Sequence, residues 1–314
     1  MLYIYIVYKI YKINNIYNNM EEEHNCTYVG SIGIQKSCHI IVNNLHALYT
    51  IDYTNIKNNT IIYVKPDFFL LFKEIVKNQL KNKVILVSGD SDYTIPTDFF
   101  TSQRDFLEFI ENKNIIHWFS QNCIIDHTKI TKIPIGLDYH TMTTSNRLGW
   151  GDVLTSIDQE KELIEIKEIG LPFYERIPRC YSNFHFFTKN RYGSDRINAM
   201  TNIPNELIYY EPKKLKRKES WLNQLKYAFV VCPHGNGLDT HRLYEALCLG
   251  CIPIVKTSDL DKLYEGLPVL IVQKWSDITE LLLTERLLWF KNQEFQYNKL
   301  TLEYWVNLIK KYRG

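Results

Sequence analysis

Residues 229–255, FVVCPHGNGLDTHRLYEALCLGCIPIV, hold the side chains whose types and spacing best suit chemistry. The run predicts a short apolar strand, a glycine-containing loop, a helix and a second apolar strand after Gly250. Where a loop leads into a helix, free backbone N–H groups and the helix dipole favour an anion. His234 and Arg242 add side-chain donors at the same place. The pattern therefore predicts a site for a phosphorylated or diphosphate ligand, and a nucleotide-sugar fits it best.

The predicted helix carries its polar residues on one border. Leu243, Ala246 and Leu247 share the stripe that must face the sheet, whereas Arg242 and Glu245 are three residues apart beside that stripe. Arg242 can grip a phosphate bidentately, and Glu245, about 4.5 Å further along the axis, can accept the sugar hydroxyls next to it. The alternative is an ordinary surface pair. The dinucleotide fingerprint and the P-loop are both excluded, because the third glycine and the GK[ST] sequence are absent.

The rest of the chain alternates between predicted strands and helices. Short apolar runs without polar alternation, separated by helical patterns, are typical of buried parallel strands. The predicted strands are residues 39–42, 61–64, 84–87, 115–119, 130–135, 180–186, 206–210, 228–231, 252–255 and 269–272. Helices are expected at residues 67–81, 98–112, 156–169, 195–201, 219–227, 240–249, 259–265, 276–292 and 297–312.

A helix that opens with Ser156-Ile-Asp-Gln159 and stops at Gly170-Leu-Pro172 marks the expected domain boundary. We therefore expect an N-terminal Rossmann-like acceptor domain at 1–172. A C-terminal donor-binding domain with closing helices is expected at 173–314. The predicted fold class is α/β, with two Rossmann-like domains that face each other across a cleft (GT-B type) and ligand groups at the carboxyl ends of the strands.

The run CPHGNGLDTHRLYEALCLGCIPIV resembles the core motif of exostosin-like glycosyltransferases, with their glycine-containing loop, R-x-x-E-A-L and G-C-I-P-V/I. The following segment, Leu267 to Trp275, is similar to the family's L-P-F-x-x-x-x-x-W, with Val269 in place of the aromatic residue. The HGNG loop departs from the family's usual Arg-Gly-Tyr-Gly form. The resemblance covers residues 180–280 and implies the GT-B fold, a nucleoside-diphosphate-sugar donor, Arg242 near the diphosphate and Glu245 near the ribose. It also implies inversion at the anomeric carbon.

Two further segments extend the expected donor site. Asn183 or His185, at the end of a strand, can point into the cleft, and Arg191 can supply a second cation at the next helix. Strand packing and a solvated arginine are the alternatives. The expected donor-binding residues are His234, Gly235, Asn236, Gly237, Asp239, Arg242, Glu245, Asn183 and Arg191.

Inverting transfer needs a general base near the acceptor hydroxyl. Two strand-end loops of the first half supply candidates, which the sequence does not rank: Asp138, His140, Asp92 and Asp90. Asp90-Ser-Asp92 also matches the short DxD pattern that can hold Mg²⁺ or Mn²⁺. Because the HGNG motif places the donor in the other half, a divalent metal is not expected, and no other cofactor is required.

Composition limits the remaining classes. The chain is 45% hydrophobic and 23% charged, which excludes global disorder, and its net charge of +2 gives no electrostatic case for nucleic acid. The seven cysteines show no zinc spacing and are expected to be free, buried thiols of a cytoplasmic, reducing compartment. Residues 1–17 are apolar but contain Lys9 and Lys12, so neither a membrane anchor nor membrane association is expected.

The sequence therefore predicts a glycosyltransferase that moves a sugar from a UDP- or GDP-type donor to a glycan or glycoprotein acceptor. It would act by inversion and without a metal. The alternative is a non-catalytic GT-B-like protein that binds a nucleotide or glycan. An epimerase or a phosphorylase fits less well, because neither a Tyr-x-x-x-Lys site nor a pyridoxal phosphate lysine context is present.

Overall fold

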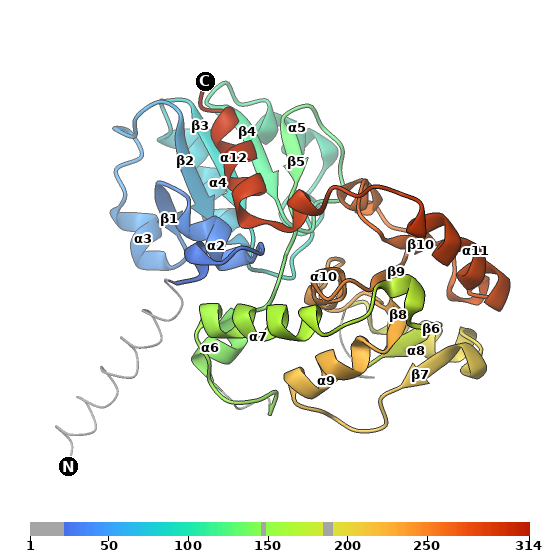
Figure 1. Cartoon of the computed structure of the whole chain (residues 1–314). Helices are drawn as coiled ribbons and strands as arrows, with labels where there is room; N and C mark the ends of the chain where they lie inside the picture. Colours follow the sequence, from blue (N-terminus) through green and yellow to red (C-terminus); the bar gives the residue numbers. More distant parts are fainter. Residues whose placement is uncertain (1–21, 146–148, 185–190) are drawn as a thin grey trace, which may run out of the picture.

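The computed structural model describes residues 22–145, 149–184 and 191–314 of the chain. Two five-stranded sheets, each built only of parallel pairs, form two domains that lie one above the other in Figure 1. The predicted class, α/β with two domains built on parallel strands, is confirmed.

The first sheet takes its strands in sequence order, β1-β2-β3-β4-β5, without a reversal. Its strands are β1 (Ile40–Val42), β2 (Thr60–Val64), β3 (Val84–Ser88), β4 (Ile115–Ser120) and β5 (Ile130–Lys132). The helices of this half are α2 (Ser31–Lys36), α3 (Leu45–Thr50), α4 (Phe69–Asn78) and α5 (Gln103–Ile110). β3 and β4 are almost entirely apolar and buried, as expected for central parallel strands with both faces covered.

Alternate residues of these strands enter different cores. Ile62 and Leu86 pack with the aromatic residues of α4 and α5, whereas Tyr63 and Val87 face the opposite side. That opposite core continues without a break into the second domain, where it includes Val230 and other apolar residues. The two domains are therefore joined by shared apolar packing, which is the dominant stabilising term in folded proteins.

The second sheet has the order β10-β9-β8-β6-β7, so the order in which strands are added to the sheet reverses between β6 and β8, although all strands stay parallel. Its strands are β6 (Ile177–Ser182), β7 (Ile208–Tyr210), β8 (Tyr227–Val231), β9 (Ile252–Lys256) and β10 (Leu270–Val272). Its helices are α8 (Gly193–Asn202), α9 (Arg217–Gln224), α10 (His241–Cys248) and α11 (Glu280–Lys291). In an open α/β sheet such a reversal opens a crevice at the strand ends where ligands bind.

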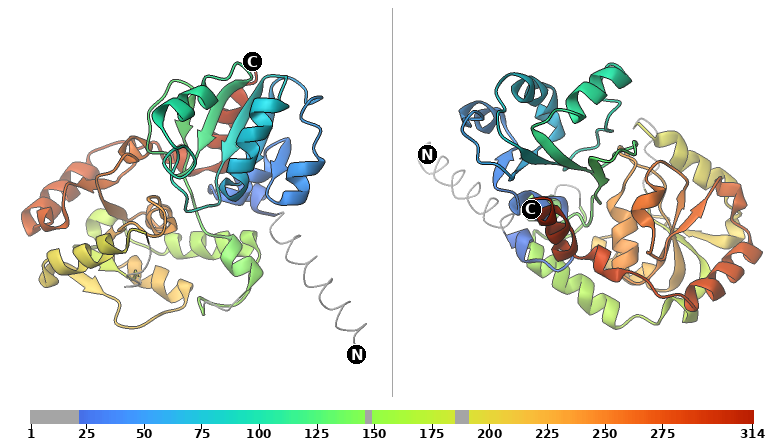
Figure 2. Two further views of the ribbon diagram at one scale, coloured as in Figure 1. Left: turned by 180° about the vertical axis from the view of Figure 1, so that it is seen from behind. Right: turned by 90° about the horizontal axis from the view of Figure 1, so that it is seen from above.

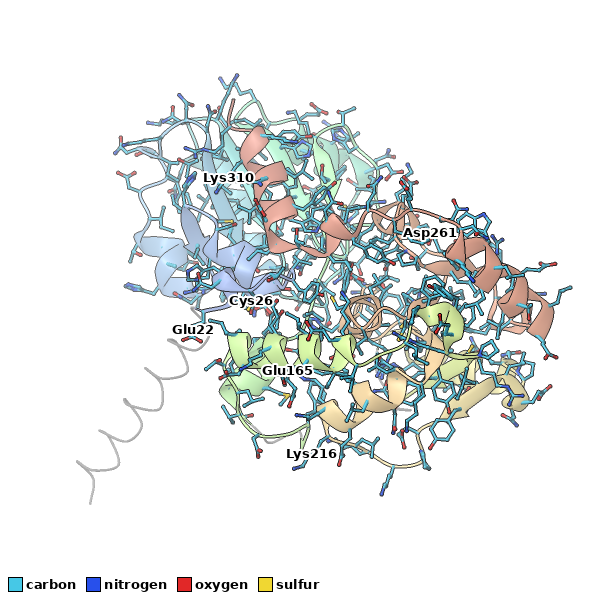
Figure 3. The ribbon with its side chains drawn as sticks, in the orientation of Figure 1. Glu22, Cys26, Glu165, Lys216, Asp261 and Lys310 are labelled. Atoms are coloured by element: carbon cyan, nitrogen blue, oxygen red, sulfur yellow. The ribbon has the colours of Figure 1, made fainter. Side chains whose placement is uncertain are left out.

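Two segments tie the halves together. α6 (His140–Thr144) and α7 (Ser156–Glu168) lie with the second domain in Figure 1, and α7 contacts both α9 and the 3-10 helix η1 (Glu22–Asn25). The last helix, α12 (Leu302–Lys311), returns to the first sheet, as the position of Lys310 in Figure 3 shows. There the ring of Tyr312 lies 3.9 Å from that of His117. The division at residue 172 stays a prediction.

Figure 2 shows the return of α12 to the first sheet from two further sides, with the red C-terminal helix beside the blue and cyan strands. Val29 N donates to Leu300 O at 2.9 Å, and Leu302 N donates to Thr27 O at 2.9 Å. The C-terminal segment is thus hydrogen-bonded to the start of the described chain.

Several predicted boundaries were wrong by a few residues. The helix expected at 98–112 begins only at Gln103, because Ser102 accepts from Asp105 N and caps it. The helix expected to open at Ser156 does begin there, and its N-cap is Thr155, whose hydroxyl accepts from Asp158 N. The strand expected at 130–135 ends at Lys132. Residues 133–139 instead form a loop directed toward the second domain.

The strand expected at 180–186 likewise ends at Ser182. All seven cysteines are free and buried, as expected. Within the described ranges, we find no helix long and apolar enough to cross a bilayer.

Candidate functional site

A cavity of about 460 Å³ lies between the two domains, at the strand ends where the second sheet reverses. The loops after β3 and β5 contribute to it from the first domain. The loops after β6, β7 and β8 and the start of α10 contribute from the second. Its lining is Asp92, Ile135, Asp138, Trp150, Asn183, Phe184, Arg196, Glu211, Pro212, Lys213, Lys214, Leu215, Arg217, Ser220, Trp221, Gly235, Asn236, Gly237, Asp239, Thr240, His241, Arg242 and Glu245.

Arg242 occupies this cavity in a fixed orientation. Its Nε donates to Asn183 Oδ1 at 2.8 Å, and Asn183 Nδ2 in turn donates to the hydroxyl of Ser220. The guanidinium carbon lies 5.9 Å from the centre of the Phe184 ring. Because the Nε is the atom that is bonded, the two terminal nitrogens of the fork remain directed away from Asn183. This geometry suits bidentate binding of a phosphate.

A second guanidinium, that of Arg196 on α8, lines the same end of the cavity. Its Nε donates to His234 O at 3.2 Å. Burial and then the positive charge of Arg242 lower the pKa of Arg196 to about 10, which still leaves Arg196 charged at neutral pH. Two like charges held close together disfavour each other until an anion enters between them. A diphosphate would supply the required charge.

The glycine loop lets the backbone come close to this pair of cations. A Cβ on Gly235 would lie 3.1 Å from Arg196 Nη2, and a Cβ on Gly237 would lie 2.9 Å from Asn122 Nδ2. Thr240 precedes the first turn of α10, and no side chain caps that turn. Free N–H groups of an uncapped helix start, next to two guanidinium groups, form a favourable anion site.

Asp195 holds the glycine loop in place. Its carboxylate accepts from His234 N at 3.0 Å and from Trp275 Nε1 at 2.9 Å, and it pairs with Lys256 at 2.6 Å. Burial alone would raise the pKa of Asp195, but the bonds from Lys256 and Trp275 outweigh it and lower the pKa. Trp275 thus supports the loop and does not line the cavity.

Asp239 was expected to bind the donor, and the structure gives it a bracing position between the domains. Its buried carboxylate accepts from Ile135 N and from Tyr244 OH, both at 2.8 Å, and from Tyr264 OH at 3.2 Å. Its backbone N–H donates to Asn122 Oδ1 at 2.9 Å. Burial raises the pKa of Asp239, against the opposing effect of these donors. Every one of these bonds restrains the loop that leads into α10.

Glu245 lines the cavity one turn beyond Arg242. Among the described residues no side chain or backbone group donates a hydrogen bond to its carboxylate. Burial raises its pKa, and the positive charges of Arg217 and Arg242 oppose that shift. Arg217 itself is buried, donates to Asp138 O at 2.8 Å and stacks 4.7 Å from the Trp221 ring. The Glu245 carboxylate is therefore available to a ligand in the cavity.

The four base candidates separate in space. Asp138 and Asp92 line the cavity. Asp90 is paired with Lys65 at 2.7 Å and is not among the lining residues. His140 also lies outside the lining, with its Nδ1 3.3 Å from Asp138 Oδ1. In the described part of the chain, no three His, Cys, Asp or Glu side chains gather in a metal-binding arrangement.

Most of the expected donor residues do meet at the cavity, and two lie apart from it. The His234 ring is turned toward its own loop, with Nδ1 2.8 Å from Leu238 O. Arg191 makes a bidentate ion pair with Asp98 of the first domain, with one bond at 2.7 Å. His185 lies outside the described residues. The other expected donor residues line the cavity: Gly235, Asn236, Gly237, Asp239, Arg242, Glu245 and Asn183.

Sequence reasoning missed two arginines. Arg196 lies in the first turn of a helix that was expected to start at Asp195, so its position after a strand was a usable signal. Arg217 belongs to the basic run Lys213 to Lys218, and a run of this composition is typical of solvated surface. Only the packing of α9 against α7 shows that this one member of the run is buried.

A more open cavity of about 630 Å³ lies elsewhere between the domains, beside β5 and α12. Its lysines already have partners. Lys132 and Lys262 both pair with Asp126, and Lys299 donates to two backbone carbonyls. None of the predicted site residues lines it.

Comparison with known proteins adds little at the level of sequence. No protein-family model matches the chain, and no curated protein does. Among solved structures, the chain is similar to a trehalose-6-phosphate protein from E. coli bound with UDP-2-fluoro glucose. The identity is 10%, the match covers 82% of this chain and 74% of that chain, and the TM-score is 0.36. It is also similar to an α1,3-fucosyltransferase with GDP-fucose, at 11% identity, with 90% and 95% of the two chains covered and a TM-score of 0.34. The interpretation of the site rests on the geometry of this chain.

Proposed function

We propose that the protein is a glycosyltransferase that uses a nucleoside-diphosphate sugar of the UDP or GDP type. One observation carries the proposal: two guanidinium groups, those of Arg242 and Arg196, converge on an uncapped helix start in a cavity at the strand reversal. Such a site binds a compact group with more than one negative charge. The exostosin-like motif lies at the same place, and we propose membership of that family on its residues.

The neighbouring side chains suit a sugar on either side of the diphosphate. Glu245 offers a carboxylate to the ribose hydroxyls one turn along α10. Asp92 and Asp138 reach the cavity from the first domain, where we propose that a glycan or glycoprotein acceptor binds. The leaving diphosphate would be stabilised by the two arginines and the helix N–H groups, so the displacement needs no metal in this proposal.

Binding of UDP, GDP and CMP to the purified chain, measured by calorimetry, tests the donor site. We expect Arg242→Ala to weaken binding of the preferred nucleotide by about 10- to 100-fold, because a charge-assisted hydrogen bond contributes about 1.5–3 kcal/mol. Arg104→Ala is the matched control, because Arg104 is an exposed arginine paired only with Glu108 on α5. Equal affinity of the Arg242→Ala variant and the wild type would overturn the donor site.

Turnover is tested separately with the preferred nucleotide sugar. Release of UDP or GDP that depends on added glycan acceptors is expected of a transferase. Nucleotide binding without any release across an acceptor panel would instead indicate the non-catalytic binding protein.

A further inference from the structure

His241 is the first residue of α10 and lines the cavity directly before Arg242. Its Nδ1 lies 2.7 Å from the carbonyl oxygen of Gly136, in the loop that follows β5 of the other domain. A carbonyl oxygen can only accept a hydrogen bond, so Nδ1 must carry the hydrogen. In the neutral imidazole the lone pair is then left on Nε2.

The carbonyl that fixes this ring is itself fixed. Gly136 has φ +69 and bridges Gly30, and Leu137 N donates to Val29 O at 2.8 Å. A Cβ at Gly136 would lie 2.1 Å from Val29 O, so any residue other than glycine would clash there. The contact between His241 and Gly136 therefore joins two rigid segments from different domains and sets the orientation of the imidazole.

Acidic groups surround the same ring. The charge of His241 acts on Asp138, Asp239 and Glu245, and it is the largest of the effects that lower the pKa of Asp138 against its burial. The His140 ring lies 6.1 Å from that of His241. Arg242 is the next residue, and the positive charge of Arg217 acts on the same Glu245 carboxylate. Carboxylates beside an imidazole stabilise the positive charge that the ring gains when it accepts a proton.

We propose that His241 is the general base of the transfer, a role that rests on the proposed glycosyltransferase function. Nε2 takes the proton of the acceptor hydroxyl while the hydroxyl oxygen forms its bond to the anomeric carbon. The bond from that carbon to the diphosphate oxygen breaks, and its electron pair leaves with the diphosphate, which Arg242 holds. The imidazolium then returns the proton to solvent. Asp138 acts as a positioning and charge-stabilising residue.

The other candidates are less well arranged for this step. Asp138 Oδ1 already accepts from Thr141 N at 3.0 Å and contacts His140. His140 lies outside the cavity lining. Asp92 is exposed, and no second group orients it among the described residues. Of these described groups, only the His241 imidazole combines a fixed tautomer, a place in the cavity and neighbouring carboxylates, in the way that catalytic bases do.

The decisive variant is His241→Asn. The asparagine amide can still donate to Gly136 O, but it has no basic nitrogen in place of Nε2. We expect UDP or GDP binding to remain within about 3-fold of wild type and transfer to fall by at least about 100-fold, the usual contribution of general base catalysis. His46→Asn on α3, an exposed histidine, is the matched control. If His241→Asn transfers at the wild-type rate, or if only His140→Asn abolishes transfer, the assignment is wrong.

Two further readouts separate this inference from the proposed function. Histidine ¹⁵N spectra of the wild type without any substrate should show His241 as the Nδ1–H tautomer at pH 8, and an Nε2–H tautomer would overturn the assignment. In kinetics, kcat/KM should fall on the acid side as the ring protonates. A fall only on the alkaline side would indicate a phosphate-binding imidazolium and would also overturn it. If the wild type binds no nucleotide, the proposed function is wrong. The measured tautomer of His241 does not depend on nucleotide binding and would still be valid.

Discussion

Arg242 donates from Nε to Asn183 Oδ1 at 2.8 Å, so a residue at the end of β6 aims the cation on α10. Asn183 is in turn held by Ser220 of α9. The three residues come from three different elements of the second domain, and their meeting point is the strand reversal. Asn183 therefore positions the arginine and is one step removed from the ligand.

Asn183→Ala should weaken nucleotide binding without unfolding the protein. Loss of one hydrogen bond to a charged group predicts a fall in affinity of roughly 10-fold. Calorimetric titration with UDP and GDP measures it. Asn202→Ala serves as the control, because Asn202 bonds only to the backbone of its own helix α8. An unchanged dissociation constant for Asn183→Ala would contradict the positioning role.

Asp239→Asn should lower the stability of the whole molecule, because the carboxylate accepts hydrogen bonds from both domains. The amide nitrogen cannot accept, so at least one buried donor loses its partner, at a cost of about 1–3 kcal/mol. Urea unfolding measures the change in the free energy of unfolding. Asp259→Asn is the control, since Asp259 is exposed and only its backbone carbonyl is bonded. Equal midpoints for the two variants would refute the bracing role of Asp239.

Glu23 predicts a pH dependence of stability. Its buried carboxyl accepts from Gly33 N at 2.8 Å, and burial, helped by the charges of Asp138 and Asp90, raises its pKa from 4.5 to about 8. Between these two values the folded chain keeps a proton that the unfolded chain releases. The protonated Glu23 carboxyl therefore makes its full contribution to stability below the unfolded pKa, and this contribution is lost as the pH rises toward about 8.

Glu23→Gln removes this titration and should keep the bond to Gly33 N. We expect the variant to match the wild type at pH 5 and to exceed its free energy of unfolding at pH 9, by on the order of 3 kcal/mol. Urea titrations at pH 5, 7 and 9 test this, with Glu22→Gln as the neighbouring control. If the free energies of unfolding of Glu23→Gln and of the wild type changed in parallel from pH 5 to pH 9, a raised pKa of Glu23 would be ruled out.

Trp275→Phe should loosen the glycine loop from a distance. Phenylalanine keeps most of the buried ring but loses the bond from Nε1 to Asp195, at a cost of about 1 kcal/mol. Because Asp195 also accepts from His234 N, we expect weaker nucleotide binding together with a lower melting temperature. Trp289→Phe on α11, whose ring is exposed, is the matched control. Wild-type affinity of Trp275→Phe for the nucleotide would show that the glycine loop does not depend on the hydrogen bond from Trp275 to Asp195.

Much of the fold could be read from the sequence because the strands are continuous apolar runs. The central strands β3, β8 and β9 were predicted to within a residue or so of their observed ends. The start of α5 was placed less well, because several polar residues precede this helix and only Ser102 serves as its cap. The place of α12 on the first sheet could not be predicted, since an amphipathic helix does not specify which apolar surface it will cover.

The sequence by itself determined where the proposed anion site lies. A strand, a glycine loop and a helix start with Arg242 and Glu245 on one border follow from local rules of geometry and charge. Only the tertiary structure decided what surrounds that site. Arg196 and Arg217 are brought in from separate helices, Arg191 is taken up by Asp98, and His241 is oriented by a carbonyl of the other domain. These contacts join residues far apart in the chain, and local periodicity carries no information about which distant elements will pack together.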